Sequence, residues 1–159
     1  MYTPGLFFFV ILLICSFLLG GVPFSLLIGK WLLGKDVRDY GDGNPGAANV
    51  FRAGNLVTGI LALVLDITKA MPFVLVAQLL MDLSGIYAAV IALAAILGHA
   101  FSPLLGWRGG KALAVSLGAL LSLGLIYYAV VYLLCLFIFL ALLQKQLFNR
   151  LLLGPLFEP

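Results

Sequence analysis

Charged residues are scarce in this chain. Asp, Glu, Lys and Arg make up 9% of its 159 residues, whereas hydrophobic residues make up 64%. Soluble domains carry roughly 25% charged residues. This composition excludes a soluble enzyme, a nucleic-acid-binding domain and a disordered chain, because each of them needs a polar, solvated surface. A net charge of +3 gives no separate support to nucleic-acid binding. We therefore expect an integral membrane protein that binds no nucleic acid.

Cysteine and histidine are also rare. Cys15 and Cys135 each lie in apolar sequence, their spacing is not typical of metal ligands, and His99 is the single histidine. We expect both thiols to be buried. We also expect no metal site and no cofactor, because the chain offers no cluster of soft ligands.

Long apolar runs are what the chain has instead. About 20 apolar residues cross a ~30 Å hydrocarbon core as a helix. The runs that meet this length are 6–33, 56–81, 85–106 and 112–144. The last run is too long for one upright span, so it is either one tilted span or a half-helix at 112–123 followed by a span at 125–143.

The runs together predict an all-α fold. We expect a polytopic integral membrane helical bundle with four or five transmembrane segments, forming one domain over 1–159 with an interfacial tail at 145–159. Pro23 lacks a backbone N–H and follows two glycines, so the first span is expected to kink there. The basic residues gather in loops 34–55 and 107–111, which places both loops on the cytoplasmic side.

The first basic loop contains a candidate phosphate-binding segment. Gly43 and Gly46 allow the backbone to turn sharply toward a ligand, while Asn44, Asn49 and Arg52 supply hydrogen-bond donors. The alternative is an ordinary polar connection in which Asn and Gly form turns.

The second basic loop contains Gly109, Gly110 and Lys111 before a long apolar run. A helix that starts here would direct backbone N–H groups and the lysine toward an anion. The alternative is that Arg108 and Lys111 only anchor the chain at the membrane surface.

Asp66 and Lys69 lie inside the second apolar run, three residues apart and so on one face of a helix. Ionisable groups inside a membrane are costly and often mark a functional site. A structural ion pair is the competing interpretation, and a small transporter built on these two residues is a third. His99 also allows two interpretations, a hydrogen-bonded packing residue or a residue that contacts a ligand.

These segments, taken together and in this order, resemble the bacterial membrane glycerol-3-phosphate acyltransferases that use acyl-phosphate as the acyl donor. The segment 41–52 is similar to the first motif of that family, 65–72 to its intramembrane Asp/Lys segment, and 98–111 to its second motif. The segment 21–30 is similar to the first helix. The resemblance covers roughly residues 18–118.

The resemblance implies transfer of a fatty acyl group from acyl-phosphate to glycerol-3-phosphate, which gives lysophosphatidic acid for phospholipid synthesis at the cytoplasmic face of a bacterial inner membrane. It implies that Lys111 and His99 are catalytic. The phosphate-binding residues it implies are Gly43, Asn44, Gly46, Asn49, Arg52, Gly109 and Gly110, with Asp66 and Lys69 as intramembrane polar residues.

Several positions depart from the family pattern. Asp42 and Ala48 stand where the first motif has Ser and Thr, and Val115 stands where a hydroxyl follows the second motif. The His and Asn of a later motif fall on Leu143 and Leu147, so part of the substrate-binding wall is expected to be missing. These departures motivate an alternative, a non-catalytic relative that binds lipid or serves as a subunit of a larger membrane assembly.

Overall fold

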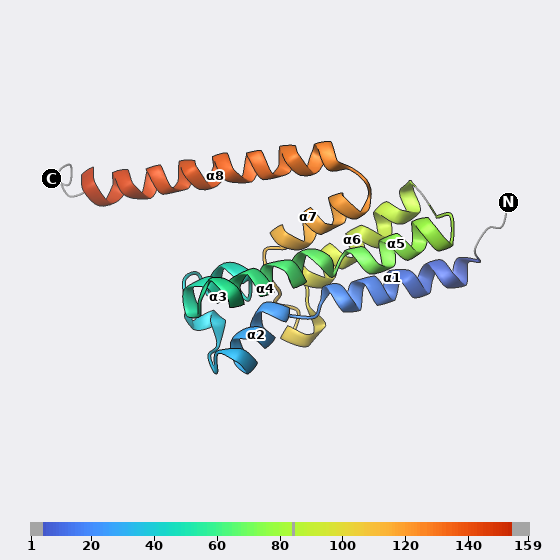
Figure 1. Ribbon diagram of the computed structural model, residues 1–159, viewed down its shortest axis with the longest axis horizontal. Coiled ribbons are helices and arrows are strands. Elements are labelled where there is room, and N and C mark those ends of the chain that lie inside the picture. The colour runs from blue at the N-terminus through green and yellow to red at the C-terminus, as the bar shows by residue number, and fades with distance from the viewer. Residues whose placement is uncertain (1–4, 84, 154–159) are drawn as a thin grey trace. The chain divides into compact units, whose positions relative to one another are not determined.

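The computed structural model describes residues 5–83 and 85–153, the last ten of them by backbone only. Over these ranges the chain is helical and contains no strand, which confirms the all-α prediction. The helices are α1 (Leu6–Gly20), α2 (Phe24–Leu32), η1 (Val37–Asp39), α3 (Ala47–Ala53), α4 (Leu56–Thr68), α5 (Met71–Leu80), α6 (Ile86–Ala100), η2 (Pro103–Leu105), α7 (Leu113–Ser122) and α8 (Ile126–Leu153), as labelled in Figure 1.

The helices divide into two compact units, with the boundary between Leu125 and Ile126. In the described residues, Leu56–Leu80, Ile86–Leu105 and Ile126–Leu143 are long and apolar enough to cross a membrane, and α1 with α2 would make a fourth, bent span. α7 is a shorter apolar helix that matches the half-helix alternative for 112–123. The single-domain organisation over 1–159 stays a prediction.

The first unit contains the predicted kink. α1 and α2 meet at an angle of 41°, and Pro23 precedes the first residue of α2. A break inside a membrane frees backbone carbonyls, which need new donors because no water reaches them. Ser102 Oγ donates to the Gly21 carbonyl at 2.5 Å, and Lys69 Nζ donates to the Val22 carbonyl at 3.1 Å. The break therefore brings side chains from two other parts of the chain to one point.

α1 packs closely along α6 in the same unit (Figure 1). Small residues make this approach possible, as is common between membrane helices. A Cβ atom at Gly20 would overlap the backbone of Ala95, and one at Gly98 would overlap the carbonyl oxygen of Phe17. Ser16 adds a hydrogen bond from Oγ to the Ile91 carbonyl at 2.8 Å. The packing holds the C-terminal end of α6 against α1. The second basic loop follows directly after this end.

The second unit consists of α8, which extends from Ile126 to Leu153. The helix continues beyond the predicted span at 125–143 into the first part of the predicted tail, and residues 154–159 lie outside the described part of the chain. The expectation of buried thiols is wrong, since Cys15 is half-buried and Cys135 is exposed. An apolar side chain on a membrane helix need not be covered by protein, because lipid is as apolar as a protein core.

The substitution Gly98→Ala tests the contact between α1 and α6. The new methyl group would overlap the Phe17 carbonyl, which belongs to the backbone and cannot turn aside. We expect the free energy of unfolding in detergent to fall by about 1–3 kcal/mol, as for other overpacked sites. Leu93→Met, on an exposed position of α6, is the control and should leave stability nearly unchanged. Equal stability of the two variants would contradict the close packing.

Candidate active site

The loop between α2 and α3 is held in place by its own local contacts. Asp36 caps η1 by accepting a hydrogen bond from the Arg38 backbone N–H at 2.9 Å. Val37 is completely buried and packs under the loop. Gly41 and Gly43 have φ angles of +59° and +72°, a conformation that glycine adopts without steric cost. The chain can therefore turn twice before α3 begins.

Asp42, between those two glycines, connects the two basic loops. Its carboxylate accepts hydrogen bonds from the Asn44 backbone N–H at 3.3 Å and from Asn49 Nδ2 at 3.0 Å. Its other oxygen accepts from Lys111 Nζ at 2.6 Å. The hydrogen bond from Lys111 is the largest of the causes that lower the pKa of Asp42 to about 2. The ion pair is therefore complete at neutral pH and is lost only as the pH falls through about 2.

Asn49 and Arg52 lie behind this loop. Asn49 is only 1% exposed, and besides Asp42 its Nδ2 atom donates to the Asn44 carbonyl at 2.9 Å. Its Oδ1 atom accepts from Arg52 Nη1 at 2.6 Å. Asn49 therefore fixes the loop by direct hydrogen bonds, and Arg52 holds the Asn49 side chain in place.

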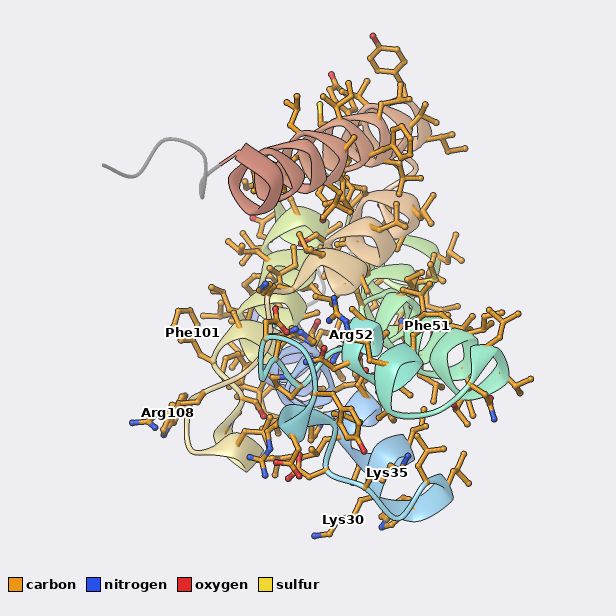
Figure 2. All side chains as sticks on the ribbon, turned by 90° about the vertical axis from the view of Figure 1, so that its left-hand side faces the viewer. Lys30, Lys35, Phe51, Arg52, Phe101 and Arg108 are labelled. Carbon is orange, nitrogen blue, oxygen red and sulfur yellow. The ribbon has the colours of Figure 1, made fainter. Side chains whose placement is uncertain are left out.

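A pocket of about 520 Å³ lies where the two loops meet. It is lined by Arg38, Asp42, Gly43, Asn44, Pro45, Leu105, Arg108, Gly109 and Lys111. Three cationic side chains and one carboxylate therefore line the pocket. In Figure 2 the labelled Arg108 side chain extends outward from its loop. This excess of positive charge suits an anionic ligand that two loops can grip together.

The glycines of the second loop have another role than the one expected. The Gly109 N–H donates to the Ala100 carbonyl and the Gly110 N–H to the His99 carbonyl, both at 3.0 Å. These N–H groups satisfy the end of α6 and are not free for an anion. Lys111, which follows them directly, is the cation of this motif that faces the pocket.

Ala112 begins the next segment in a strained conformation. Its φ angle of +59° lies in the left-handed region, which costs roughly 1–2 kcal/mol for a residue with a side chain. Such strain is often found beside ligand-binding segments, and here it sets the direction in which the chain leaves Lys111 for α7.

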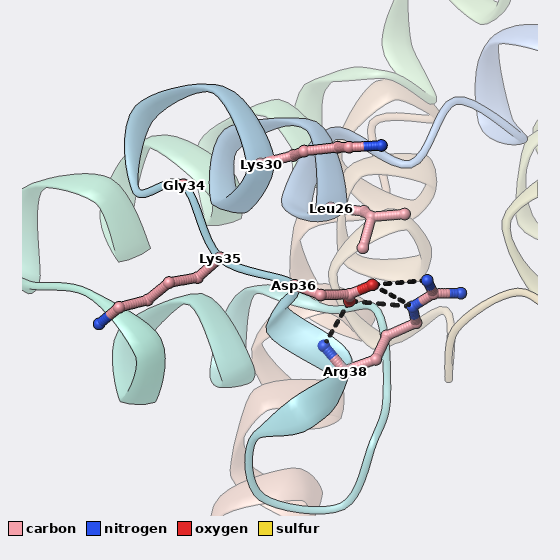
Figure 3. Close-up of a pocket in the computed structure, with 6 residues that line it drawn as sticks. All are labelled: Leu26, Lys30, Gly34, Lys35, Asp36 and Arg38. Carbon is pink, nitrogen blue, oxygen red and sulfur yellow. Dashed lines mark hydrogen bonds and ion pairs between the residues drawn. The ribbon is translucent and has the colours of Figure 1, made fainter.

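A second pocket, of about 230 Å³, is also lined by Arg38. Figure 3 shows Leu26 between Lys30 and the pair formed by Asp36 and Arg38, with Lys35 pointing away. Arg38 Nη2 donates to Asp36 at 2.6 Å. The side-chain hydrogen bond from Arg38 is the main reason that the pKa of Asp36 is lowered to about 2. Arg38 lines both pockets, so its ion pair with Asp36 also holds in place a residue that lines the larger pocket.

The intramembrane polar residues form a closed cluster below the second loop. Lys69 Nζ lies 2.9 Å from Asp66 Oδ1 and 2.7 Å from His99 Nδ1, and Ser25 Oγ donates to Asp66 Oδ2 at 2.7 Å. Asp66 and Lys69 are 2% and 3% exposed. Both charges are buried and paired with each other at 2.9 Å, which favours the ion-pair interpretation over a transport path.

The structure brings together only part of the predicted site. Gly43, Asn44, Gly109 and Lys111 line the larger pocket, whereas Gly46, Asn49, Arg52, Gly110 and His99 lie outside its lining. Sequence reasoning missed Arg38 and Arg108 as pocket residues. Arg108 directly precedes Gly109 in the second motif, and this position could have indicated a role in binding. A basic residue in a membrane loop is equally typical of the cytoplasmic side, so the position alone does not distinguish the two. Among the described side chains, no group of three or more His, Cys, Asp or Glu could hold a metal ion.

The family model of glycerol-3-phosphate acyltransferases matches residues 10–153. The chain belongs to this family. A glycerol-3-phosphate acyltransferase of Anaeromyxobacter sp. (strain Fw109-5) is 40% identical over 133 residues, which is 77% of this chain and 66% of the relative. One of Lactiplantibacillus plantarum is 41% identical over 113 residues, which is 71% of this chain and 54% of the relative. The chain thus spans about two thirds or less of the length of these relatives.

Solved structures of the family have the same fold. A crystal structure of PlsY, an integral membrane glycerol 3-phosphate acyltransferase, in its glycerol 3-phosphate form superimposes with a TM-score of 0.73 at 34% identity, covering 83% of this chain and 66% of that one. The lysophosphatidic acid form superimposes with a TM-score of 0.71 at 28% identity, over 95% of this chain and 78% of that one. The resemblance seen in the motifs is therefore confirmed at the level of family and fold, and the chain is an integral membrane protein.

The substitution Asp42→Asn tests the competition for Lys111. Without the carboxylate, Lys111 would be free to meet an anion in the pocket, whereas Arg38 stays paired with Asp36. We expect the affinity for inorganic phosphate to rise roughly two- to fivefold, the range of an exposed ion pair. Calorimetric titration of the purified protein with phosphate measures this change. Asp82→Asn, in the turn between α5 and α6, is the matched control. An unchanged or weaker affinity in Asp42→Asn would contradict the competition.

Proposed function

We propose that this protein is a glycerol-3-phosphate acyltransferase, which transfers a fatty acyl group from acyl-phosphate to glycerol-3-phosphate and releases lysophosphatidic acid for phospholipid synthesis. The observation that carries the proposal is the meeting of the two family motifs at one cationic pocket, where Lys111 reaches the loop of Asp42 at 2.6 Å. Membership in the family supports it, as do the glycerol 3-phosphate and lysophosphatidic acid forms of the solved relative.

The phosphate groups are proposed to bind among Arg38, Arg108 and Lys111, beside Gly43 and Asn44. Guanidinium groups grip phosphate with two parallel hydrogen bonds, whereas the lysine acts as a point charge. Asn49 and Arg52 keep the first loop in shape from behind. The apolar helices supply a surface for the acyl chain.

The chemical step is proposed to need no covalent enzyme intermediate. The 1-hydroxyl oxygen of glycerol-3-phosphate forms a bond to the acyl carbonyl carbon, and the bond from that carbon to the phosphate oxygen of the donor breaks. The phosphate leaves with the electron pair and takes up the hydroxyl proton. Lys111 stabilises the charge that develops on the donor as this bond breaks.

The reaction is proposed to occur at the cytoplasmic face of a bacterial inner membrane. Loops 34–55 and 107–111 are the basic loops of the chain, and basic loops stay on the cytoplasmic side. Both contribute residues to the same pocket, which supports their placement on one side. A soluble phosphorylated alcohol would reach the pocket from there.

A second candidate function is that of a non-catalytic relative within a larger membrane assembly. Asp42 favours it, because this carboxylate already occupies Lys111. Stoichiometric copurification with other membrane proteins, together with absence of turnover, would support it over the enzyme.

The substitution Lys111→Ala tests the proposed enzyme in liposomes that contain palmitoyl-phosphate and labelled glycerol-3-phosphate. We expect the wild-type protein to form labelled lysophosphatidic acid and kcat of the variant to fall by roughly 100-fold or more, as when a group that stabilises transition-state charge is removed. The Lys30 side chain extends outward in Figure 2 and does not line the larger pocket, so Lys30→Ala should retain activity. Equal turnover of Lys111→Ala and wild type would exclude the proposed role of Lys111.

A further inference from the structure

The smaller pocket, of about 230 Å³, lies at the end of the bent span formed by α1 and α2. Leu26 and Lys30 line it from α2, and their spacing puts both side chains on one face of that helix. Trp31, which follows Lys30, is 75% exposed. Exposed tryptophans are typical of the level of the lipid headgroups. The pocket therefore lies near that level, with Leu26 one helical turn deeper.

Asp36 and Arg38 line the same pocket, and Figure 3 shows Leu26 between Lys30 and this pair. The Asp36 carboxylate accepts hydrogen bonds from Arg38 Nε at 2.9 and 3.2 Å and from Nη2 at 2.6 Å. A guanidinium group has five N–H donors. Among the described residues, none accepts a hydrogen bond from Nη1. Asp36 thus orients the guanidinium group and leaves part of it for a ligand.

Lys30 adds a positive charge that forms no ion pair among the described residues. Its side chain is exposed and extends to the same side as the Arg38 guanidinium group in Figure 3. Hydrogen bonds from Arg38 are the main reason that the pKa of Asp36 is low, and the nearby charge of Lys30 lowers it further. Lys35 points away, and its Nζ donates to the Ala53 carbonyl at 2.7 Å. Lys30 therefore leaves this side of the pocket with one positive charge in excess.

Size and charge limit the ligand that this pocket can take. Pockets that bury a whole drug-sized molecule have roughly 300–1,000 Å³, so a pocket of about 230 Å³ suits a headgroup phosphate rather than a complete lipid. A phosphodiester carries one negative charge, which matches the excess charge of the pocket. Basic pockets beside membrane helices bind such headgroups, and each Lys or Arg near the surface strengthens the binding roughly fivefold.

We propose that Lys30 and Arg38, with Leu26 between them, bind the phosphodiester of an anionic phospholipid at the membrane surface. A soluble phosphate would use the same cations, but the apolar Leu26 side chain and the exposed Trp31 beside the pocket favour a lipid. The site is separate from the proposed acyl transfer, because neither Leu26 nor Lys30 lines the larger pocket.

The fluorescence of Trp31 tests this site, because Trp31 adjoins Lys30. Trp107→Phe leaves Trp31 as the single tryptophan. This variant is placed in phosphatidylcholine vesicles that contain increasing fractions of brominated phosphatidylglycerol or, in a parallel series, of brominated phosphatidylcholine. Bromine quenches a tryptophan only at close contact, so the two series give the relative affinity of the lipids beside Trp31. We expect a preference for phosphatidylglycerol of roughly fivefold or more. Equal quenching in the two series would overturn the proposal.

Variants in the Trp107→Phe background separate a site from general surface charge. We expect Lys30→Gln to reduce the preference roughly fivefold and Lys30→Arg to retain it. Arg108→Gln is the matched control, because it removes the same charge from the other basic loop, outside this pocket. It should leave the preference nearly unchanged. An equal loss in Lys30→Gln and Arg108→Gln would overturn the proposal. Both side chains are exposed, so we expect all of these variants to fold.

Inorganic phosphate distinguishes a lipid from a soluble ligand. Any salt screens the attraction between the protein and anionic lipid, whereas a soluble phosphate that binds in the pocket would also displace the lipid. We expect phosphate and chloride at equal ionic strength to weaken the preference equally. A larger loss with phosphate would assign the pocket to a soluble phosphate and overturn the lipid site. None of these measurements involves turnover, so failure here would leave the proposed function intact.

Discussion

The structure depends on one buried charge, the ammonium group of Lys69. A charge inside an apolar bundle is tolerated only when its hydrogen bonds are satisfied by other groups. Lys69 finds its partners in the broken segment between α1 and α2, on its own helix and at the end of α6. The kink at Pro23 is therefore more than a bend in a helix, because the carbonyl that it frees is one of the three acceptors the charge needs.

The end of α6 transmits this constraint to the surface loop. His99 contacts Lys69 through its ring and holds Gly110 through its backbone carbonyl. The hydrogen bonds from Gly109 and Gly110 set the path of the chain to Lys111, and Lys111 then pairs with Asp42 in the other loop. The polar cluster inside the membrane and the cationic pocket are thus two ends of one connected set of contacts.

Asp42 gives the cationic pocket an unusual balance of charge. Its carboxylate neutralises Lys111 when no ligand is bound, and Asn49 holds it in that place. A phosphate group bound as proposed would compete with this carboxylate, and its affinity would then depend on Arg38 and Arg108 more than the family motifs alone would indicate. Asp42 stands where the family motif has Ser, and it adds a negative charge that pairs with Lys111.

The sequence by itself determined the helical membrane class, the kink at Pro23 and the family, because each follows from local composition, from length or from motifs of nearby residues. It left 112–143 open between one tilted span and a half-helix followed by a span, and the structure shows the short helix α7. Asp66 and Lys69 were also placed correctly on one helical face by their spacing. Only the tertiary structure decided that His99 completes their cluster, that the N–H groups of the second loop are used by α6, and that Arg38 and Arg108 line the pocket. These contacts join residues from different helices and loops, and spacing along the chain carries no information about which of several basic side chains will point into a shared cavity.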